Sequence, residues 1–169
     1  LDELGAGMET ITSAVGVDNG IILFLVNNHG LYMLNEKTGE TKLLNTPAGP
    51  NMVFVDKQQR VYLYADKGIY EYDWRHQKSQ FLLPSNGRSY NGMVVDSEGN
   101  LYLTSPGYGL YVWHRKSGKM TQYQMDDKRP HGTVCNNWIV NVNLDSKGRL
   151  WCATTYGVSC MDIKTGRFD

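Results

Sequence analysis

The fold is decided by residues 138–168, which read WIVNVNLDSKGRLWCATTYGVSCMDIKTGRF. Short apolar runs alternate here with clusters of turn-forming residues, such as Ser146-Lys147-Gly148 and Lys164-Thr165-Gly166. Runs of this kind, bounded by Gly, Ser, Thr and Asp, are typical of β-strands joined by tight turns. The stretch therefore predicts an antiparallel meander of short strands.

The same pattern occurs four times along the chain. Each copy has an aspartate at the end of its first apolar run and a glycine 12 or 13 residues later. The aspartates are Asp18, Asp56, Asp96 and Asp145. The glycines are Gly30, Gly68, Gly109 and Gly157. Because this spacing is kept inside every copy, we interpret the chain as four repeats of one structural unit.

Two further columns of residues support the repeat. An aromatic residue stands six positions after each aspartate, and a branched aliphatic residue directly follows each glycine. The aromatic residues are Phe24, Tyr62, Tyr102 and Trp151. The aliphatic residues are Leu31, Ile69, Leu110 and Val158. We interpret the aromatic column as core packing between neighbouring repeats, since full burial of a large apolar side chain contributes roughly 1.5–3 kcal/mol.

The repeat length favours a β-propeller. Successive repeat glycines lie 38, 41 and 48 residues apart, and repeats of about 40 residues with four short strands are typical of propeller blades. Apolar residues recur at every second position, which is strand spacing and not helix spacing. We predict an all-β β-propeller of about four blades, each a four-stranded antiparallel meander, as a fragment of a larger ring. The predicted parts are a lead-in (1–10), blade 1 (11–50), blade 2 (51–89), blade 3 with a long connector (90–137) and an incomplete blade 4 (138–169).

The later repeats resemble a known family. The sequences DSKGRLWCATTYGV and DIKTGRF within residues 145–168, with DSEGNLYLT at 96–104, are similar to the two-component regulator propeller repeat. The resemblance extends over residues 11–168. It is looser in the first two repeats, where DKQQR at 56–60 lacks the turn glycine.

This resemblance implies a function for the region. Repeats of this family form the periplasmic sensor of bacterial hybrid two-component proteins, in which two propellers precede a β-sandwich, a membrane span and a histidine kinase. Such sensors often respond to oligosaccharides. The resemblance thus implies signal transduction, carbohydrate sensing, self-association of the sensor region as a dimer, and no enzyme in this region. A resemblance of this sort determines fold better than function.

Composition argues against several partners. The formal charge of the 169 residues is zero, and Lys and Arg form no cluster of the kind that binds nucleic acid phosphates. The sequence has no apolar run of about 18 residues, which argues against a membrane span or membrane contact in this region. It shows no signal peptide either. We expect that the chain ends are not natural domain borders.

The cysteines allow two readings, and no cofactor is predicted. Cys152 aligns with leucines in the other repeats, which favours a buried reduced thiol. Cys160 lies across the same predicted hairpin, so a Cys152–Cys160 disulfide is the alternative in an oxidising periplasm. Cys135 lies in a loop. No Cys-x-x-Cys or His-x-x-x-His spacing indicates a metal site.

Propeller topology predicts which loops gather. Connectors between blades and the loops between second and third strands share one side of the disc, named here the connector side. The turns between first and second and between third and fourth strands share the other, the turn side. Variable loops collect on the connector side, and the longest connector, residues 125–137, is a place to expect function.

The connector side is predicted to bind a small molecule or an oligosaccharide. Its loops are rich in aromatic, amide and hydroxyl side chains, which stack against the apolar faces of a sugar and bond to its hydroxyl groups. The candidate ligand-binding residues are Asn28, His29, Asp66, Tyr90, Asn91, Tyr108, Arg129, Trp138 and Tyr156. The alternative role for each is structural, because Asn and Tyr are also common in turns and at strand ends.

Two other functions stay open. Streptogramin lyases and related lactone-processing enzymes have a similar Asp-x-x-Gly-Asn-Leu-Tyr pattern, and resemblance to them implies a metal and a catalytic histidine or carboxylate. In that reading His29 and His131 are candidate acids or bases, oriented by Asp66. The third reading is a propeller that docks only protein.

Overall fold

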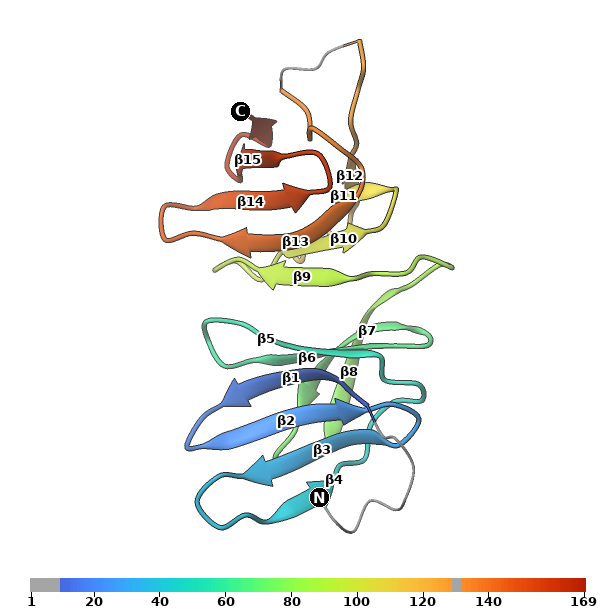
Figure 1. Ribbon diagram of the computed structural model, residues 1–169, viewed down its shortest axis with the longest axis vertical. Helices are drawn as coiled ribbons and strands as arrows, with labels where there is room; N and C mark the ends of the chain where they lie inside the picture. The colour runs from blue at the N-terminus through green and yellow to red at the C-terminus, as the bar shows by residue number, and fades with distance from the viewer. Residues whose placement is uncertain (1–9, 129–131) are drawn as a thin grey trace. The chain divides into compact units, whose positions relative to one another are not determined.

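The computed structural model of the protein describes residues 10–128 and 132–169. Every regular element in these residues is a β-strand, and they contain no helix (Figure 1). Their sixteen strands form four antiparallel sheets of four strands, each in chain order. The predicted all-β fold with propeller blades built as four-stranded meanders is confirmed.

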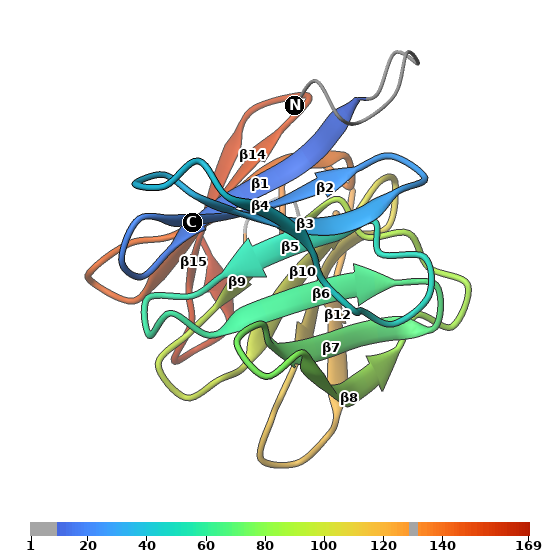
Figure 2. The same cartoon turned by 90° about the horizontal axis from the view of Figure 1, so that it is seen from below.

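Each repeat supplies one blade. Blade 1 consists of β1 (Ile11–Val17), β2 (Ile21–Val26), β3 (Gly30–Asn35) and β4 (Thr41–Leu43). Blade 2 consists of β5 (Met52–Val55), β6 (Val61–Ala65), β7 (Gly68–Asp73) and β8 (Lys78–Pro84), which Figure 2 shows side by side. Blade 3 consists of β9 (Gly92–Val95), β10 (Leu101–Ser105), β11 (Gly109–Trp113) and β12 (Met120–Tyr123). Blade 4 consists of β13 (Ile139–Leu144), β14 (Arg149–Thr154), β15 (Val158–Asp162) and β16 (Arg167–Phe168).

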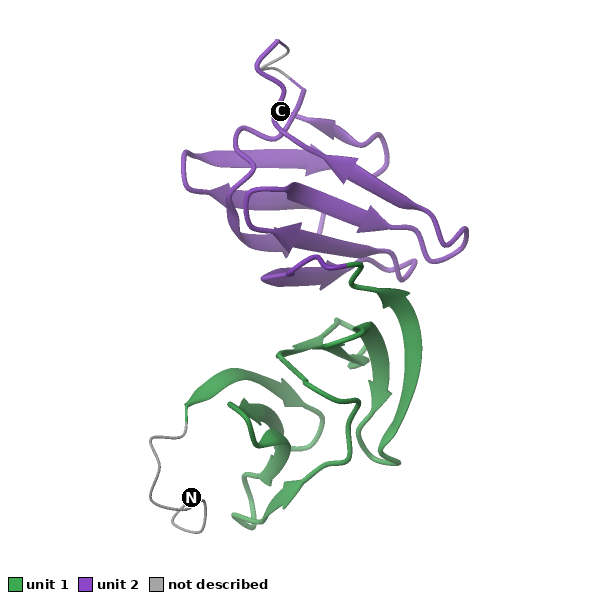
Figure 3. Cartoon of the chain, turned by 90° about the vertical axis from the view of Figure 1, so that its right-hand side faces the viewer, with its two compact units in different colours: residues 1–86 green, residues 87–169 purple. Residues whose placement is uncertain are grey.

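The chain divides into two compact units, coloured separately in Figure 3. Unit 1, residues 1–86, holds blades 1 and 2, and unit 2, residues 87–169, holds blades 3 and 4. In each unit the two blades bury one apolar core between them. The core of unit 1 includes Leu23, Leu25, Val53, Val61 and Leu63. The core of unit 2 includes Tyr102, Val112, Val142, Leu150 and Met161.

Successive blades pack through opposite faces of their sheets. In unit 2, blade 3 contributes the face that carries Val94, Tyr102 and Val112, which are neighbours across β9, β10 and β11. Blade 4 contributes the face that carries Leu150 and Met161. We call the first the forward face of a blade and the second its rear face. In unit 1 the forward face of blade 1, with Leu23, packs on the rear face of blade 2, with Val61 and Leu63.

The repeat aspartate and its aromatic partner form one polar cluster. In blade 3, Oδ1 of Asp96 accepts hydrogen bonds from the backbone N–H groups of Glu98 and Asn100, each at 2.9 Å. Its Oδ2 accepts from Asn100 Nδ2 at 2.8 Å and from the Tyr102 hydroxyl at 3.1 Å. The carboxylate therefore closes the β9–β10 turn and satisfies the buried hydroxyl of a core tyrosine.

Blades 2 and 4 repeat this cluster with different donors. Asp56 accepts from Arg60 Nε at 2.6 Å and from the Tyr62 hydroxyl at 3.3 Å. Asp145 accepts from Arg149 Nε at 2.8 Å and from the Trp151 indole N–H at 3.0 Å. These donors, the Trp151 indole first, lower the pKa of Asp145 below its ordinary value. The aromatic column thus has a polar role in addition to the packing role that we predicted.

In the first repeat the structure corrects the assignment of Phe24 to the aromatic column. Phe24, six residues after Asp18, pairs with Ala14 and Tyr32 on the rear face of blade 1, while Leu23 is the residue that joins the core with blade 2. The β1–β2 turn is tight, with Val17 paired to Ile21, and this places Asp18 one position away from the other repeat aspartates. Because side chains alternate along a strand, a shift of one residue moves Phe24 to the other face.

A second correction concerns the cysteines. The β14–β15 register pairs Cys152 with Ser159 and Trp151 with Cys160, so Cys152 and Cys160 point to opposite faces of the sheet. A disulfide between them is therefore excluded, and all three cysteines are free thiols. Cys152 lies in the core of unit 2, and burial raises the pKa of its thiol to about 12.

Candidate functional site

In unit 1 the connector side is formed by the β2–β3 loop and the connector at 44–51. Asn28 has a φ of +62°, a left-handed conformation that asparagine adopts more readily than most residues. The loop and the connector surround an open hollow of about 340 Å³. Its polar lining residues include Asn27, Asn28, His29, Thr46 and Asn51. Two predicted ligand-binding residues, Asn28 and His29, thus line one hollow.

Asp66 lies beside the same connector. Its backbone N–H donates to the carbonyl of Ala48 at 3.3 Å. A Cβ at residue 49 would overlap the Asp66 carboxylate, so the carboxylate rests directly on the backbone of Gly49. The connector therefore brings the loops that carry Asn28, His29 and Asp66 to one side of unit 1.

In unit 2 two exposed aromatic residues lie on neighbouring loops of the connector side. Tyr108, in the β10–β11 loop, is 60% exposed, and Trp138, just before β13, is 56% exposed. The Trp138 ring lies 3.5 to 3.6 Å from the position that a Cβ on Gly107 would take, so it packs on the loop of Tyr108. Gly109 N–H donates to the carbonyl of Asn137 at 3.0 Å and joins this loop to the long connector.

Tyr156 completes this surface. It is 84% exposed in the β14–β15 loop, and the N–H of its neighbour Thr155 donates to the carbonyl of Trp138 at 3.0 Å. Three of the predicted residues, each on a separate loop, are thus held together by backbone hydrogen bonds and packing. We call Tyr108, Trp138 and Tyr156 the aromatic platform.

Two amide side chains border the platform. Asn136 Oδ1 accepts from Trp138 N–H at 2.7 Å, and Asn137 Oδ1 accepts from Met125 N–H at 2.8 Å. Both use their oxygen in these bonds, and their NH₂ groups have no acceptor within the described residues. We did not assign Asn136 to the site from the sequence. The two consecutive asparagines at the end of the long connector are the sequence feature that could have indicated it.

Two predicted residues lie elsewhere. Tyr90 is 3% exposed and packs edge-on against Tyr111, with ring centres 6.2 Å apart. Asn91 joins blades 3 and 4: its Nδ2 donates to the carbonyl of Ile139 at 3.1 Å, and its Oδ1 accepts from the Thr104 hydroxyl at 2.8 Å. Both side chains are engaged inside unit 2 and do not contribute to the platform. Arg129 lies outside the described residues.

The candidate catalytic residues of the alternative enzyme function lie only partly within the described residues. His29 and Asp66 lie on loops around the same connector of unit 1, whereas His131 lies outside the described residues. Among residues 10–128 and 132–169, no group of three or more His, Cys, Asp and Glu side chains is placed to hold a metal ion.

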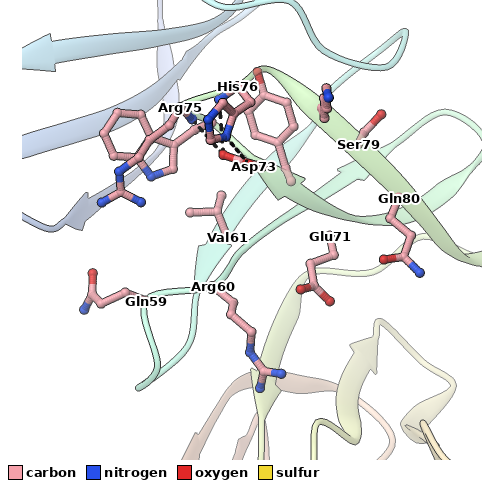
Figure 4. Close-up of a pocket in the computed structure, with 12 residues that line it drawn as sticks. Gln59, Arg60, Val61, Glu71, Asp73, Arg75, His76, Ser79 and Gln80 are labelled. Carbon is pink, nitrogen blue, oxygen red and sulfur yellow. Dashed lines mark hydrogen bonds and ion pairs between the residues drawn. The ribbon is translucent and has the colours of Figure 1, made fainter.

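A larger hollow lies on the turn side of unit 1. It has a volume of about 440 Å³ and is bordered by the β5–β6 and β7–β8 turns (Figure 4). Its charged groups are largely paired, since Arg60 bonds to Asp56, His76 Nδ1 lies 2.6 Å from Asp73 Oδ2, and Arg75 bonds to Asp18. The His76 hydrogen bond lowers the pKa of Asp73.

Comparison with solved structures finds this fold in proteins of different function. The extracellular domains of BT4673 and BT3049 from B. thetaiotaomicron, each described as a "putative hybrid two component system", match 89% and 99% of this chain, with TM-scores of 0.73 and 0.66 and identities of 21% and 15%. Virginiamycin B lyase from Staphylococcus aureus matches 94% of the chain, with a TM-score of 0.68 and 14% identity. No protein-family model and no curated protein matches the chain.

These similarities define a class by fold. The chain spans 21% of the BT4673 domain, 25% of the BT3049 domain and 54% of the lyase. At such identities the likeness establishes a β-propeller fold, which sensor domains and a lyase share, and a shared fold does not select between their functions. Within the described residues no helix is long and apolar enough to span a bilayer.

Proposed function

We propose that this chain is part of the extracytoplasmic, periplasmic sensor propeller of a hybrid two-component protein, and that its connector side binds a neutral oligosaccharide. The observation that carries the proposal is the aromatic platform with its bordering amides. The resemblance of the repeats to the two-component regulator propeller supports it, as does the shared fold of the BT4673 and BT3049 domains.

The chemistry of the platform suits a neutral sugar. The exposed rings of Trp138 and Tyr156 offer flat apolar surfaces for the C–H faces of pyranose rings, and the Asn136 and Asn137 NH₂ groups offer donors for hydroxyl oxygens. Among the described residues, the platform consists of aromatic rings bordered by amide groups, and such uncharged groups suit a neutral ligand. In unit 1 the hollow with Asn28 and His29 is a second polar contact surface.

Signalling follows from differential affinity. A ligand shifts an equilibrium between two arrangements of the sensor only as far as it binds one of them more tightly than the other. The sensor region then acts as a ligand-controlled dimer that biases the kinase across the membrane, with no catalysis in the propeller itself.

Isothermal titration calorimetry with a panel of neutral oligosaccharides tests the proposal. We expect binding by the unaltered chain, and an affinity about five- to tenfold lower in Trp138→Ala and in Tyr156→Ala, since an aromatic contact of this kind contributes about 1 kcal/mol. Phe81→Ala is the matched control, because Phe81 is an exposed aromatic residue of β8 in unit 1 and is not a member of the platform. Equal affinities in all four proteins, or turnover of the ligand into products, would contradict the proposal.

A further inference from the structure

The turn side of unit 2 carries exposed positive charge. Residues 87–169 contain ten Lys and Arg residues against seven Asp and Glu residues, although the formal net charge of the whole chain is zero. Four of these cations are lysines in the turns of blades 3 and 4. All four are exposed, and none makes an ion pair within the described residues. They are Lys116, Lys119, Lys147 and Lys164, and we call them the basic turn surface.

Contacts between the turns place these lysines on one side of unit 2. In blade 3, Arg115 N–H donates to Asn100 Oδ1 at 3.1 Å and joins the β11–β12 turn to the β9–β10 turn. In blade 4, Ile163 N–H donates to the carbonyl of Gly148 at 3.4 Å and joins the β15–β16 turn to the β13–β14 turn. The β15–β16 turn also touches blade 3, where the Tyr123 hydroxyl oxygen lies 2.8 Å from the position of a Cβ on the turn glycine. Lysines that are dispersed in the sequence therefore share one surface.

The turns do not need this charge in order to form. In the β3–β4 turn of blade 1, Glu36 and Glu40 flank a Lys-Thr-Gly sequence, whereas in blade 3 the same positions hold Arg115 and Lys119. The glycines of the two turns share a left-handed conformation, with φ of +72° and +66°. Because the same turn forms with either sign of charge, the lysines of unit 2 are available for recognition.

The carboxylates of these turns are engaged by the turns themselves. Asp162 accepts from the backbone N–H groups of Lys164 and Thr165 at 2.8 and 3.0 Å. Asp96 and Asp145 accept from turn N–H groups and from the aromatic residue six positions later. The lysine ammonium groups are therefore left as exposed donors, each with three N–H groups and no acceptor of its own.

We propose that the basic turn surface binds an acidic polysaccharide, whose chain carries carboxylate groups at intervals. Hydrogen bonds between an ammonium group and a carboxylate are charge-assisted and stronger than those between neutral groups. The hydroxyls of the exposed Ser97 and Ser146, in the same turns, suit the hydroxyl groups of sugars. Among the described residues, these turns hold no exposed large apolar residue that could enter a bilayer, which favours a polysaccharide over a membrane surface.

This surface is independent of blade packing and of the aromatic platform. Blades in both units pack through the faces of their sheets, whereas the lysines lie in turns at the ends of the strands. A further blade beside blade 4 would cover a sheet face and leave these turns open. The platform lies on the connector side of unit 2, so this proposal does not rest on the proposed binding of a neutral oligosaccharide.

Binding of polygalacturonate, measured by isothermal titration calorimetry at low and at physiological ionic strength, tests the proposal. We expect the unaltered chain to bind, more weakly as salt increases, because salt screens exposed charges. Uncharged dextran should not bind. The triple variant Lys116→Gln, Lys147→Gln, Lys164→Gln should bind polygalacturonate about tenfold more weakly, a difference of about 1.4 kcal/mol, since several exposed ion pairs are lost together.

The triple variant Lys37→Gln, Lys57→Gln, Lys78→Gln is the matched control. It removes the same charge from three exposed lysines at the turns of unit 1 and should bind like the unaltered chain. Circular dichroism checks that both variants are folded. The proposal is overturned if the unaltered chain does not bind polygalacturonate, if it binds dextran equally, or if both triple variants lose the same affinity. Binding to phosphatidylglycerol vesicles in place of polygalacturonate would assign the surface to a membrane and overturn it as well.

Discussion

A single carboxylate at the same repeat position organises the local structure of three blades. Asp56, Asp96 and Asp145 each accept from the backbone N–H groups two and four residues later and from the aromatic ring six residues later. Hydrogen bonds to a charged acceptor are stronger than those between neutral groups. The aspartate and its aromatic partner therefore recur together because each satisfies the other.

Removing one such carboxylate should be costly. We expect Asp96→Ala to lower the free energy of unfolding by about 2–4 kcal/mol, because it leaves the buried Tyr102 hydroxyl and two turn N–H groups without their acceptor. Urea unfolding measures this change. Asp18→Ala is the control, since within the described residues Asp18 makes an exposed ion pair with Arg75, and its removal should change stability by less than about 1 kcal/mol. Equal losses in the two variants would show that the cluster is not stabilising.

The Cys152 thiol makes stability depend on pH in the alkaline range. Burial raises its pKa to about 12, whereas a thiol in the unfolded chain titrates near its ordinary value of about 8.5. The unfolded chain therefore releases this proton first, and the contribution of the thiol to stability is complete below about pH 8.5 and is lost as the pH rises toward 12. The slope from this group is at most about 1.4 kcal/mol per pH unit.

Comparison with Cys152→Ala isolates this contribution. Urea unfolding from about pH 8 to about pH 11 should show a shallower fall in stability for the variant than for the unaltered chain, whatever the absolute stability of each. Parallel curves would mean that the Cys152 thiol ionises equally in the folded and the unfolded chain.

At the level of elements, blades are joined by side chains as well as by apolar cores. Asn91, at the start of blade 3, bonds to the carbonyl of Ile139 in blade 4 and to the buried hydroxyl of Thr104. In unit 1, Ser13 of blade 1 both donates to the carbonyl of Val53 in blade 2 and accepts from its N–H. These hydrogen bonds fix how one sheet is aligned along its strands against the next.

Asn91→Ala should therefore destabilise unit 2. We expect a loss of about 1–3 kcal/mol, because the Ile139 carbonyl loses a donor and the buried Thr104 hydroxyl keeps only its longer contact of 3.5 Å to the carbonyl of Gly92. Asn143→Ala is a matched control, since Asn143 is an exposed asparagine of β13, and it should change stability little. Thermal unfolding followed by circular dichroism measures both. A loss of stability in the control as large as that in Asn91→Ala would count against the inter-blade bond.

The sequence predicts the strands and loops better than it predicts exposure. The repeated aspartates and glycines locate the turns, and the loops of Tyr108, Trp138 and Tyr156 share one side of unit 2, as the meander topology requires. Tyr90 packs against Tyr111 and Asn91 bonds to the carbonyl of Ile139 in blade 4, and no spacing within one repeat encodes these contacts. A tight turn also shifts the first repeat by one residue, which a count from Asp18 does not detect.

At the level of the whole molecule, each unit has an apolar core between its own two blades. Leu63 and Leu150 are fully buried, one in each core, on the rear faces of blades 2 and 4. A cavity in one core removes contacts only from the blades that form it. Truncation of either leucine to alanine should lower the free energy of unfolding by about 2–5 kcal/mol. The loss of stability should be confined to the unit that contains the leucine.

Hydrogen exchange measured by mass spectrometry locates such a loss, because amides exchange faster where local opening becomes easier. We expect Leu63→Ala to increase exchange in β2, β3, β6 and β7 and to leave β10, β11, β14 and β15 near their original protection. Leu150→Ala should give the reverse pattern, so each variant is the control for the other. Uniform acceleration across both units in either variant would mean that the blades unfold as one cooperative body, and that the two cores are not independent sources of stability.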